Sequence, residues 1–191
     1  MTAIQRFKNA LQECLIEKDI TAQIFKGYEA ISDKSPKERK AAFFIQAIGQ
    51  IEKLCDDELC HNIRDACACS KGGWRLKAMQ KIAKGGQGQS LEQKLQAIGQ
   101  VTHMGNPVLK ENGTITAGIG ERGGFQCPCP IFDGLELAQA VSKTYCYCCA
   151  GHFRYHYQIA LSKKLRTQVV VSSALASRGE EPCRFVFEIV E

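Results

Sequence analysis

The sequence predicts an α+β fold in which N-terminal helices pack on a small antiparallel sheet made of two hairpins. Apolar residues recur at helical spacing up to Gly105-Asn106-Pro107, and beyond it they alternate on either side of tight turns. This change of period is the main observation behind the prediction. We expect a single α+β domain over residues 1–191, with a helical part over about 1–104 and a sheet and cysteine-rich part over about 105–191.

Amphipathic helices are expected throughout the N-terminal part. Their apolar residues recur every three or four positions, as Phe7, Leu11 and Leu15 do in the first helix. Capping boxes at Ser35-Pro36-Lys37-Glu38 and Ser90-Leu91-Glu92-Gln93 mark two helix starts. The apolar faces fit either a core within the chain or a second subunit, which leaves a homo-oligomer open. The expected helices cover residues 3–17, 20–31, 35–60, 74–84 and 90–101.

Two hairpins are expected in the C-terminal part. Asn112-Gly113 is a dipeptide that supplies two positive-φ residues to the tight turn of the first hairpin. In the second hairpin, Cys183 and Phe185 alternate onto one face of the last strand. The expected elements are strands over 108–111, 114–117, 169–176 and 183–190, with helices over 133–141 and 150–165 between the hairpins.

Composition restricts the compartment and the class of partner. The chain has no apolar signal-peptide run and no stretch as long as a membrane span, so we expect a cytoplasmic protein with no membrane partner. The net charge of +5 is mild and the basic residues are scattered, so no nucleic-acid partner is expected. In a reducing cytoplasm, 11 cysteines favour metal binding, cluster binding or thiol catalysis over disulfides.

The densest group of potential metal ligands begins at Cys127-Pro128-Cys129. Prolines stiffen this loop and lower the entropy cost of bringing two sulfurs to one ion. Further cysteines at 146–149 are expected just before a helix N-terminus, where the helix dipole lowers thiol pKa values, with His152 in the first turn. Four of these side chains would satisfy tetrahedral zinc. The predicted metal ligands are Cys127, Cys129, Cys148, Cys149 and His152.

Other interpretations of these cysteines stay open. An iron-sulfur cluster is the main alternative to zinc, although the spacing matches no ferredoxin motif. Thiol redox chemistry at Cys148 or Cys149 is another, and a purely structural role is a third, because free cysteine is among the most buried residue types. The thiolates that would hold a cluster are Cys127, Cys129, Cys146 and Cys148.

A second group of thiols and one imidazole lies in the helical part. These residues fit core positions slightly better than ligand positions. If Cys67-Ala68-Cys69 folds back towards Cys127-Pro128-Cys129, however, the paired Cys-x-Cys units would form a four-sulfur site. The group consists of Cys55, Cys60, His61, Cys67 and Cys69.

A hydrolase would need groups that move a proton. His156 lies one turn after His152 on the expected last helix, within reach of a metal-bound water. Glu121 and Arg122 lie beside the thiol loop as candidate substrate contacts, although a solvated loop is the simpler explanation. In this version zinc activates a water towards an amide-like bond, with His156 or Glu121 as the acid or base.

The final hairpin carries a resemblance to known families. A glycine turn at Gly179 leads into a Cys-x-Phe strand at Cys183 and Phe185. This is similar to the closing hairpin of the vinyl-reductase-type ligand-binding domains and of the aminothiazoline carboxylate hydrolase-like proteins. The resemblance implies an α+β domain with a small-molecule pocket, in families that contain both sensors and hydrolases, so the fold does not choose between these roles. The alternative is a separate bacterial family rich in cysteine.

The leading hypothesis from the sequence is a cytoplasmic zinc-binding protein that recognises a small-molecule ligand in a cysteine-rich pocket. A metal-dependent hydrolase and an iron-sulfur or thiol redox protein are the alternatives. The sequence does not decide whether the chain is an enzyme, and it does not identify the ligand.

Overall fold

The computed structural model describes residues 1–69, 71–86, 88–119 and 125–190, and it confirms the α+β class. Helices occupy the first half, and strands enter only after residue 107. The helices are α1 (Ala3–Glu13), α2 (Lys18–Phe25), α3 (Lys37–Leu54), α4 (Asp57–Ala66), α5 (Gly73–Gly85), α6 (Leu91–Gly99), the 3₁₀ helix η1 (Lys143–Cys146) and α7 (Tyr147–Leu161). The strands are β1 (Val108–Leu109), β2 (Ile115–Ile119), β3 (Lys164–Ser172) and β4 (Cys183–Val190).

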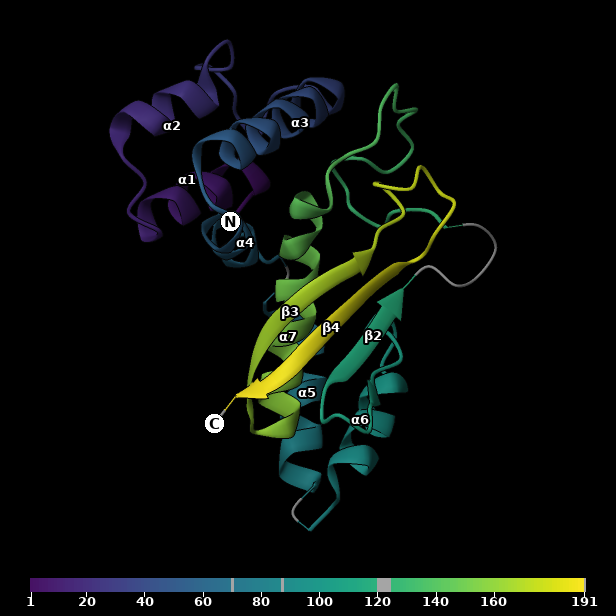
Figure 1. The fold of residues 1–191 in the computed structure, drawn as a ribbon. Coiled ribbons are helices and arrows are strands. Elements are labelled where there is room, and N and C mark those ends of the chain that lie inside the picture. The colour runs from purple at the N-terminus through teal and green to yellow at the C-terminus, as the bar shows by residue number, and fades with distance from the viewer. Residues whose placement is uncertain (70, 87, 120–124, 191) are drawn as a thin grey trace.

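The sheet consists of two hairpins joined side by side. Its strand order is β1-β2-β4-β3 and every pairing is antiparallel, with Phe185 of β4 opposite Ala117 of β2 and Val170 of β3. Helices α5, α6 and α7 lie on one side of this sheet, while α1 to α4 gather beside the start of α7 (Figure 1). The loops that precede η1 and connect β3 to β4 meet at that same end.

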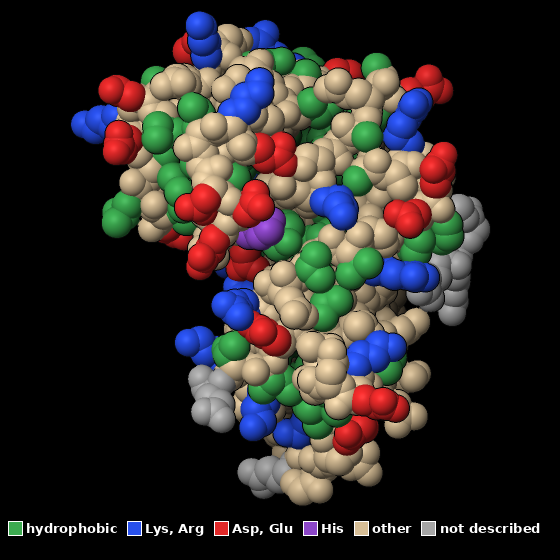
Figure 2. Space-filling model, viewed as in Figure 1, with side chains coloured by type: hydrophobic (Ala, Val, Ile, Leu, Met, Phe, Trp, Pro, Cys, Tyr) green, Lys and Arg blue, Asp and Glu red, His purple; other side chains and the backbone are tan. Residues whose placement is uncertain are grey.

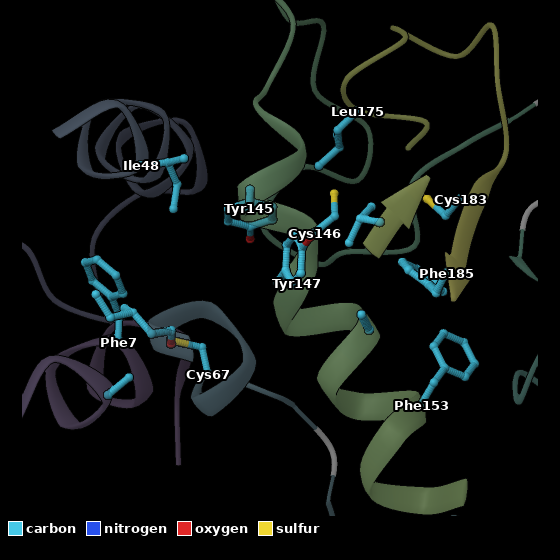
Figure 3. Packing of buried hydrophobic residues seen from close by; sticks show 14 of the residues in the cluster. Phe7, Ile48, Cys67, Tyr145, Cys146, Tyr147, Phe153, Leu175, Cys183 and Phe185 are labelled. Carbon is cyan, nitrogen blue, oxygen red and sulfur yellow. The ribbon is translucent and has the colours of Figure 1, made fainter. Parts of the chain in front are cut away.

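Two aromatic groups form the core. In the helical part, Phe7 of α1 contacts Phe25 of α2 and both phenylalanines of α3, Phe43 and Phe44, with ring centroids 5.7–6.0 Å apart. The apolar faces of these helices are therefore buried against one another within one chain. Under the sheet, Phe153 of α7 lies 5.5 Å from Phe185 (Figure 3), and burial of such rings supplies much of the stabilisation.

The seam between α4 and α7 depends on a glycine. A Cβ atom at Gly151 would lie 2.7 Å from the carbonyl oxygen of Asp65, so only glycine permits this close approach. The Asp65 carboxylate accepts hydrogen bonds from both Arg154 on α7 and Thr167 on β3. These contacts fix the C-terminal end of α4, and the cysteines that follow it, against the first half of α7.

Several local predictions are wrong. Residues 133–141 form no helix: the chain turns at 133–134, where the N–H of Asp133 bonds to Cys129 O, and is largely irregular from 135 to 141. The third helix ends at Leu54, since Asp56 caps a new helix by accepting from Leu59 N. The Ser90 capping box is confirmed, but α3 has Pro36 at its N-cap and no side-chain cap.

The first hairpin also turns differently from the prediction. Gly113 has φ +80°, but Asn112 does not have a positive φ. Lys110 and Gly113 close a β-turn, and the Asn112 carboxamide oxygen accepts from Thr114 N. One left-handed glycine therefore suffices where two positive-φ residues were expected.

Charge on the surface is mixed. Figure 2 shows lysine and arginine side chains interspersed with aspartate and glutamate over one face, without a single-sign stripe. Within the described residues, no helix is both long and apolar enough to cross a membrane.

Candidate functional site

Six cysteines from three separate segments gather where α7 begins. The loop before Phe132 supplies two, the η1–α7 corner supplies three, and the first residue of β4 supplies the sixth. All six are free thiols. We call these residues the thiol cluster: Cys127, Cys129, Cys146, Cys148, Cys149 and Cys183.

Electrostatic coupling shows that the sulfurs are neighbours. Burial raises the pKa of Cys127 to about 12, with further increases from the nearby sulfurs of Cys129, Cys183 and Cys148. Burial likewise raises the pKa of Cys149 well above its usual value, and Cys148, Cys183 and Cys146 add to it. Direct contacts also link the three segments, because Tyr145 OH lies beside Cys129 Sγ, and neighbouring residues Ser173 and Ala174 contact Cys146 Sγ and Cys183 Sγ. Figure 3 shows Cys146 and Cys183 at the same end of α7 and β4.

Backbone amides donate to two of these sulfurs. The N–H of Cys129 donates to Cys127 Sγ at 3.4 Å, within the Cys-Pro-Cys loop. The N–H of Ala174 donates to Cys183 Sγ, also at 3.4 Å, from the β3–β4 connection. Donors of this kind stabilise negative charge on sulfur, so they lower the pKa of both thiols against the effect of burial.

Hydroxyl groups contact two more sulfurs. Ser173 Oγ lies 2.9 Å from Cys146 Sγ and already accepts from the N–H groups of Leu175 and Ala176. With its lone pairs occupied, this hydroxyl directs its proton at sulfur. Tyr145 OH lies 3.1 Å from Cys129 Sγ. Four of the six sulfurs therefore have a polar hydrogen close by.

A buried cation lies beside the cluster. Arg64 of α4 is 2% exposed, and its Nε and Nη2 donate to the carbonyl oxygen of Tyr145 at 3.3 and 3.1 Å. Its guanidinium lies 4.5 Å from the Tyr145 ring centroid, and the ring points from η1 towards α3 (Figure 3). Burial by itself lowers the pKa of Arg64, but charge on Cys148, Cys67 and other nearby groups more than offsets this and raises it.

His152 is oriented by the backbone of the second cysteine group. Its Nδ1 lies 2.7 Å from Cys69 O, so Nδ1 carries the proton and Nε2 keeps its lone pair. Burial lowers the pKa of His152 to about 4, which keeps the ring neutral at pH 7. His156 is fully buried with its ring centroid 4.7 Å from that of His152.

The other candidate acid or base, Glu121, and the candidate substrate contact Arg122 lie outside the described residues.

The local setting of the predicted ligands differs from the prediction in two ways. Helix α7 begins at Tyr147, so Cys148 and Cys149 lie inside its first turn and His152 in the second. The pKa values of the Cys148 and Cys149 thiols are raised, not lowered, because burial outweighs the helix dipole; that of Cys148 rises to about 12.

Sequence reasoning missed Cys183 as a neighbour of Cys127 and Cys129. Its position as the first residue of a strand, beside a turn, was the available signal.

The second cysteine group divides between two roles. Cys60 and Cys67 are core thiols, with Sγ atoms donating to Ile51 O and Ile63 O at 3.3 and 3.2 Å. Cys69, in contrast, reaches His152 through its carbonyl oxygen, and the sulfurs of Cys67 and Cys69 are close enough to influence the pKa of Cys148. The expected fold-back was towards Cys127-Pro128-Cys129 in a four-sulfur site, whereas the neighbour found for these sulfurs is Cys148.

Ligand binding depends on whether metal ligands are already arranged around one point and on where the surface has hollows. Over the described stretches, no three His, Cys, Asp or Glu side chains are already arranged to hold one metal ion. Two surface hollows lie away from the thiol cluster. One is lined by Lys77, Gln80, Lys81, Lys84 and Gly85 of α5. The other lies between α4, α7 and β3, beside His61, Asp65, Arg154 and Thr167.

Comparison with other proteins assigns no relative. No family model matches the chain, and neither a curated protein nor a solved structure shows significant similarity to it.

Proposed function

We propose that the thiol cluster binds a thiophilic metal ion, with zinc as the leading candidate, in a cytoplasmic protein. The observation that carries the proposal is that backbone N–H groups donate to the sulfurs of Cys127 and Cys183. A neutral thiol in an apolar core usually acts as a donor to a carbonyl oxygen. Sulfurs that instead accept hydrogen bonds are placed for the thiolate form, which is the form that binds metals.

Zinc fits the donor set. It takes thiolate and neutral imidazole together in tetrahedral sites, and both are present here. Cys127, Cys129 and Cys148 are the proposed thiolate ligands, with the fourth position taken by Cys149, Cys183 or His152. The Nδ1 contact of His152 with a backbone carbonyl is the outer-sphere arrangement common to zinc-bound histidines. Cysteine side chains must rotate to close the site, since no three ligands in the described chain already surround one point.

Recognition of a small molecule has weaker support than metal binding. The hollows beside α5 and between α4 and α7 are not lined by cysteine, so a ligand would have to bind apart from the metal or enter as the cluster rearranges. A hydrolase requires in addition an open coordination position and a path for water to His156, which is fully buried. A closed, four-ligand site is the version that the geometry favours.

An iron-sulfur cluster is the second candidate. The observation in its favour is the number of sulfurs: the cluster offers six, more than a single zinc ion needs. Four thiolates without histidine would suffice. Under this proposal Cys127, Cys129, Cys148 and Cys183 are the ligands, and His152 has only an orienting role.

Metal analysis tests the proposal directly. The full chain, purified without oxygen, is assayed for zinc, iron and sulfide, and its visible spectrum is recorded. One zinc per chain with a colourless spectrum is the expected result, and iron with sulfide and visible absorption selects the second candidate. The Cys127→Ser and Cys129→Ser variants should lose the metal.

Cys14→Ser is the matched control for these variants. Cys14 is a partly exposed thiol at the C-terminal end of α1, outside the thiol cluster, and its replacement should leave the metal content unchanged. Absence of any metal from the wild-type chain, also after reconstitution with zinc or with iron and sulfide, would overturn the proposal.

A further inference from the structure

A positive charge is buried at the edge of the thiol cluster, and no carboxylate of the described residues forms an ion pair with it. Arg64 is 2% exposed, and the ion pairs formed by the described residues are Arg154 with Asp65 and Arg166 with Glu188. Its hydrogen bonds to Tyr145 O satisfy two donors but contribute no negative charge. Burial of a guanidinium in a medium of low dielectric is costly unless an anion compensates it.

The groups around Arg64 indicate which of them could carry the compensating negative charge. Aromatic rings cover the guanidinium, with centroids at 4.5 Å for Tyr145, 5.5 Å for Phe44 and 5.8 Å for Phe7. These rings provide cation–π attraction but carry no net charge. The ionisable neighbours that raise the pKa of Arg64 are the sulfurs of Cys148, Cys67 and Cys129 and the Tyr145 hydroxyl, so thiols are the groups near Arg64, among the described residues, that most readily become anions.

Helix geometry places one sulfur on the same side as the guanidinium. Arg64 binds the carbonyl oxygen of Tyr145 in η1, directly before α7, and a carbonyl in a helical turn points along the axis towards the residues that follow. Residues three apart share a helix face, which puts Cys148 directly beyond Tyr145 on the Arg64 side. Tyr145 OH contacts Cys129 Sγ as well, so the same tyrosine links Arg64 to a second sulfur.

We infer that Arg64 is the counter-cation of the thiol cluster, and that the cluster therefore holds its metal as a complex of net negative charge. This inference rests on the proposed metal binding. A divalent ion with two thiolates and two imidazoles is neutral, with three thiolates it carries charge −1, and with four it carries −2. The inference thus specifies at least three thiolate ligands, one of them Cys148, and assigns Arg64 as a positioning residue that stabilises them.

The experiment separates the charge of Arg64 from its hydrogen bonds. Arg64→Lys keeps the charge and loses the planar donor pair, whereas Arg64→Gln keeps a donor and loses the charge. Zinc affinity of the full chain is measured by competition with a chromophoric chelator. We expect Arg64→Gln to weaken zinc binding by roughly 10- to 100-fold, as for other outer-sphere partners of metal sites, and Arg64→Lys to recover most of that loss.

Arg154→Met provides the matched control. Arg154 also joins α4 to α7, through Asp65, but it is not part of the thiol cluster. Its replacement should lower the melting temperature and leave zinc affinity unchanged, which distinguishes a lost counter-charge from a loosened seam. Cobalt substitution adds a direct readout, because the intensity of sulfur-to-cobalt charge-transfer absorption counts the thiolates. Three or four are expected in the wild-type chain.

Each result has a defined meaning. Equal zinc affinity of wild type and Arg64→Gln, or two thiolates in the wild-type cobalt spectrum, overturns the inference about Arg64 and leaves the metal proposal standing. A wild-type chain that binds neither zinc nor cobalt overturns both. Should the Arg64 variants fail to fold, the thiolate count of the wild-type chain decides alone.

Discussion

The two groups of cysteines differ in the hydrogen-bonding role of sulfur. In the helical part, Cys60 and Cys67 donate their S–H protons to carbonyl oxygens of their own or a neighbouring helix. In the thiol cluster, the sulfurs of Cys127 and Cys183 accept protons from backbone amides. A donor must be a neutral thiol, whereas an accepted amide hydrogen bond lowers the pKa of the sulfur against the larger effect of burial. Both groups contain buried and partly buried cysteines, so burial alone does not distinguish a core cysteine from a candidate ligand.

Replacement of one cysteine from each group gives the largest expected difference. Cys129→Ser should weaken zinc binding by more than roughly 100-fold, since a direct ligand contributes more than an outer-sphere partner. Cys60→Ser should bind zinc normally and lose about 1 kcal/mol of unfolding free energy, because a hydroxyl replaces a buried thiol. Zinc content after dialysis and urea unfolding measure the two effects. Equal loss of zinc from both variants would contradict the distinction between the groups.

The sequence predicted the fold better than the site. The change from helical period to alternation identified the α+β class, and the cysteine spacing drew attention to Cys127, Cys129 and Cys148, whose role as ligands stays a prediction. The missing partner, Cys183, is far along the chain, and only the pairing of β2 with β4 brings it to this end of the sheet. The position of Cys183 at the start of a strand is a local signal, but that signal does not say which distant residues lie beside it.

The role of Arg64 was equally out of reach for sequence reasoning. On an amphipathic helix an arginine normally points to solvent, and nothing in its neighbours distinguishes Arg64 from Arg39 or Arg75. Its burial comes from the rings of Phe7 on α1, Phe44 on α3 and Tyr145 on η1, which cover the guanidinium.

His152 provides a pH test on the metal-free protein. Its pKa falls from 6.5 to about 4 in the folded state, so an unfolded chain takes up a proton below pH 6.5 that the folded chain refuses until about pH 4. The stabilising contribution is complete above pH 6.5 and is lost as the pH falls towards 4, at about 1.4 kcal/mol per pH unit. His152→Gln should flatten this part of the profile of unfolding free energy against pH. An unchanged slope would show that the ring is not buried as described.

The seam that joins the two cysteine groups can be opened by a single methyl group. Gly151→Ala would place Cβ 2.7 Å from Asp65 O, so α7 must move away from α4, at a cost of about 1–3 kcal/mol. Gly49→Ala is the control, because a Cβ on that helical glycine meets nothing within 4 Å, and it should gain about 0.5–1 kcal/mol. Thermal unfolding of both variants measures the opposite signs, and destabilisation by Gly49→Ala or tolerance of Gly151→Ala would contradict the packing.

The smallest expected effect concerns a single hydroxyl. Tyr145→Phe keeps the ring that packs on Arg64 and Phe44 but removes the OH group beside Cys129 Sγ. Loss of one buried hydrogen bond should cost about 1 kcal/mol in urea unfolding. Tyr28→Phe, on a half-buried tyrosine of the helical part, should be close to neutral. If the Tyr145 hydroxyl supports a thiolate, zinc should also dissociate faster from Tyr145→Phe. A loss of stability with an unchanged rate of zinc release would instead make this tyrosine part of the core, as Cys60 and Cys67 are.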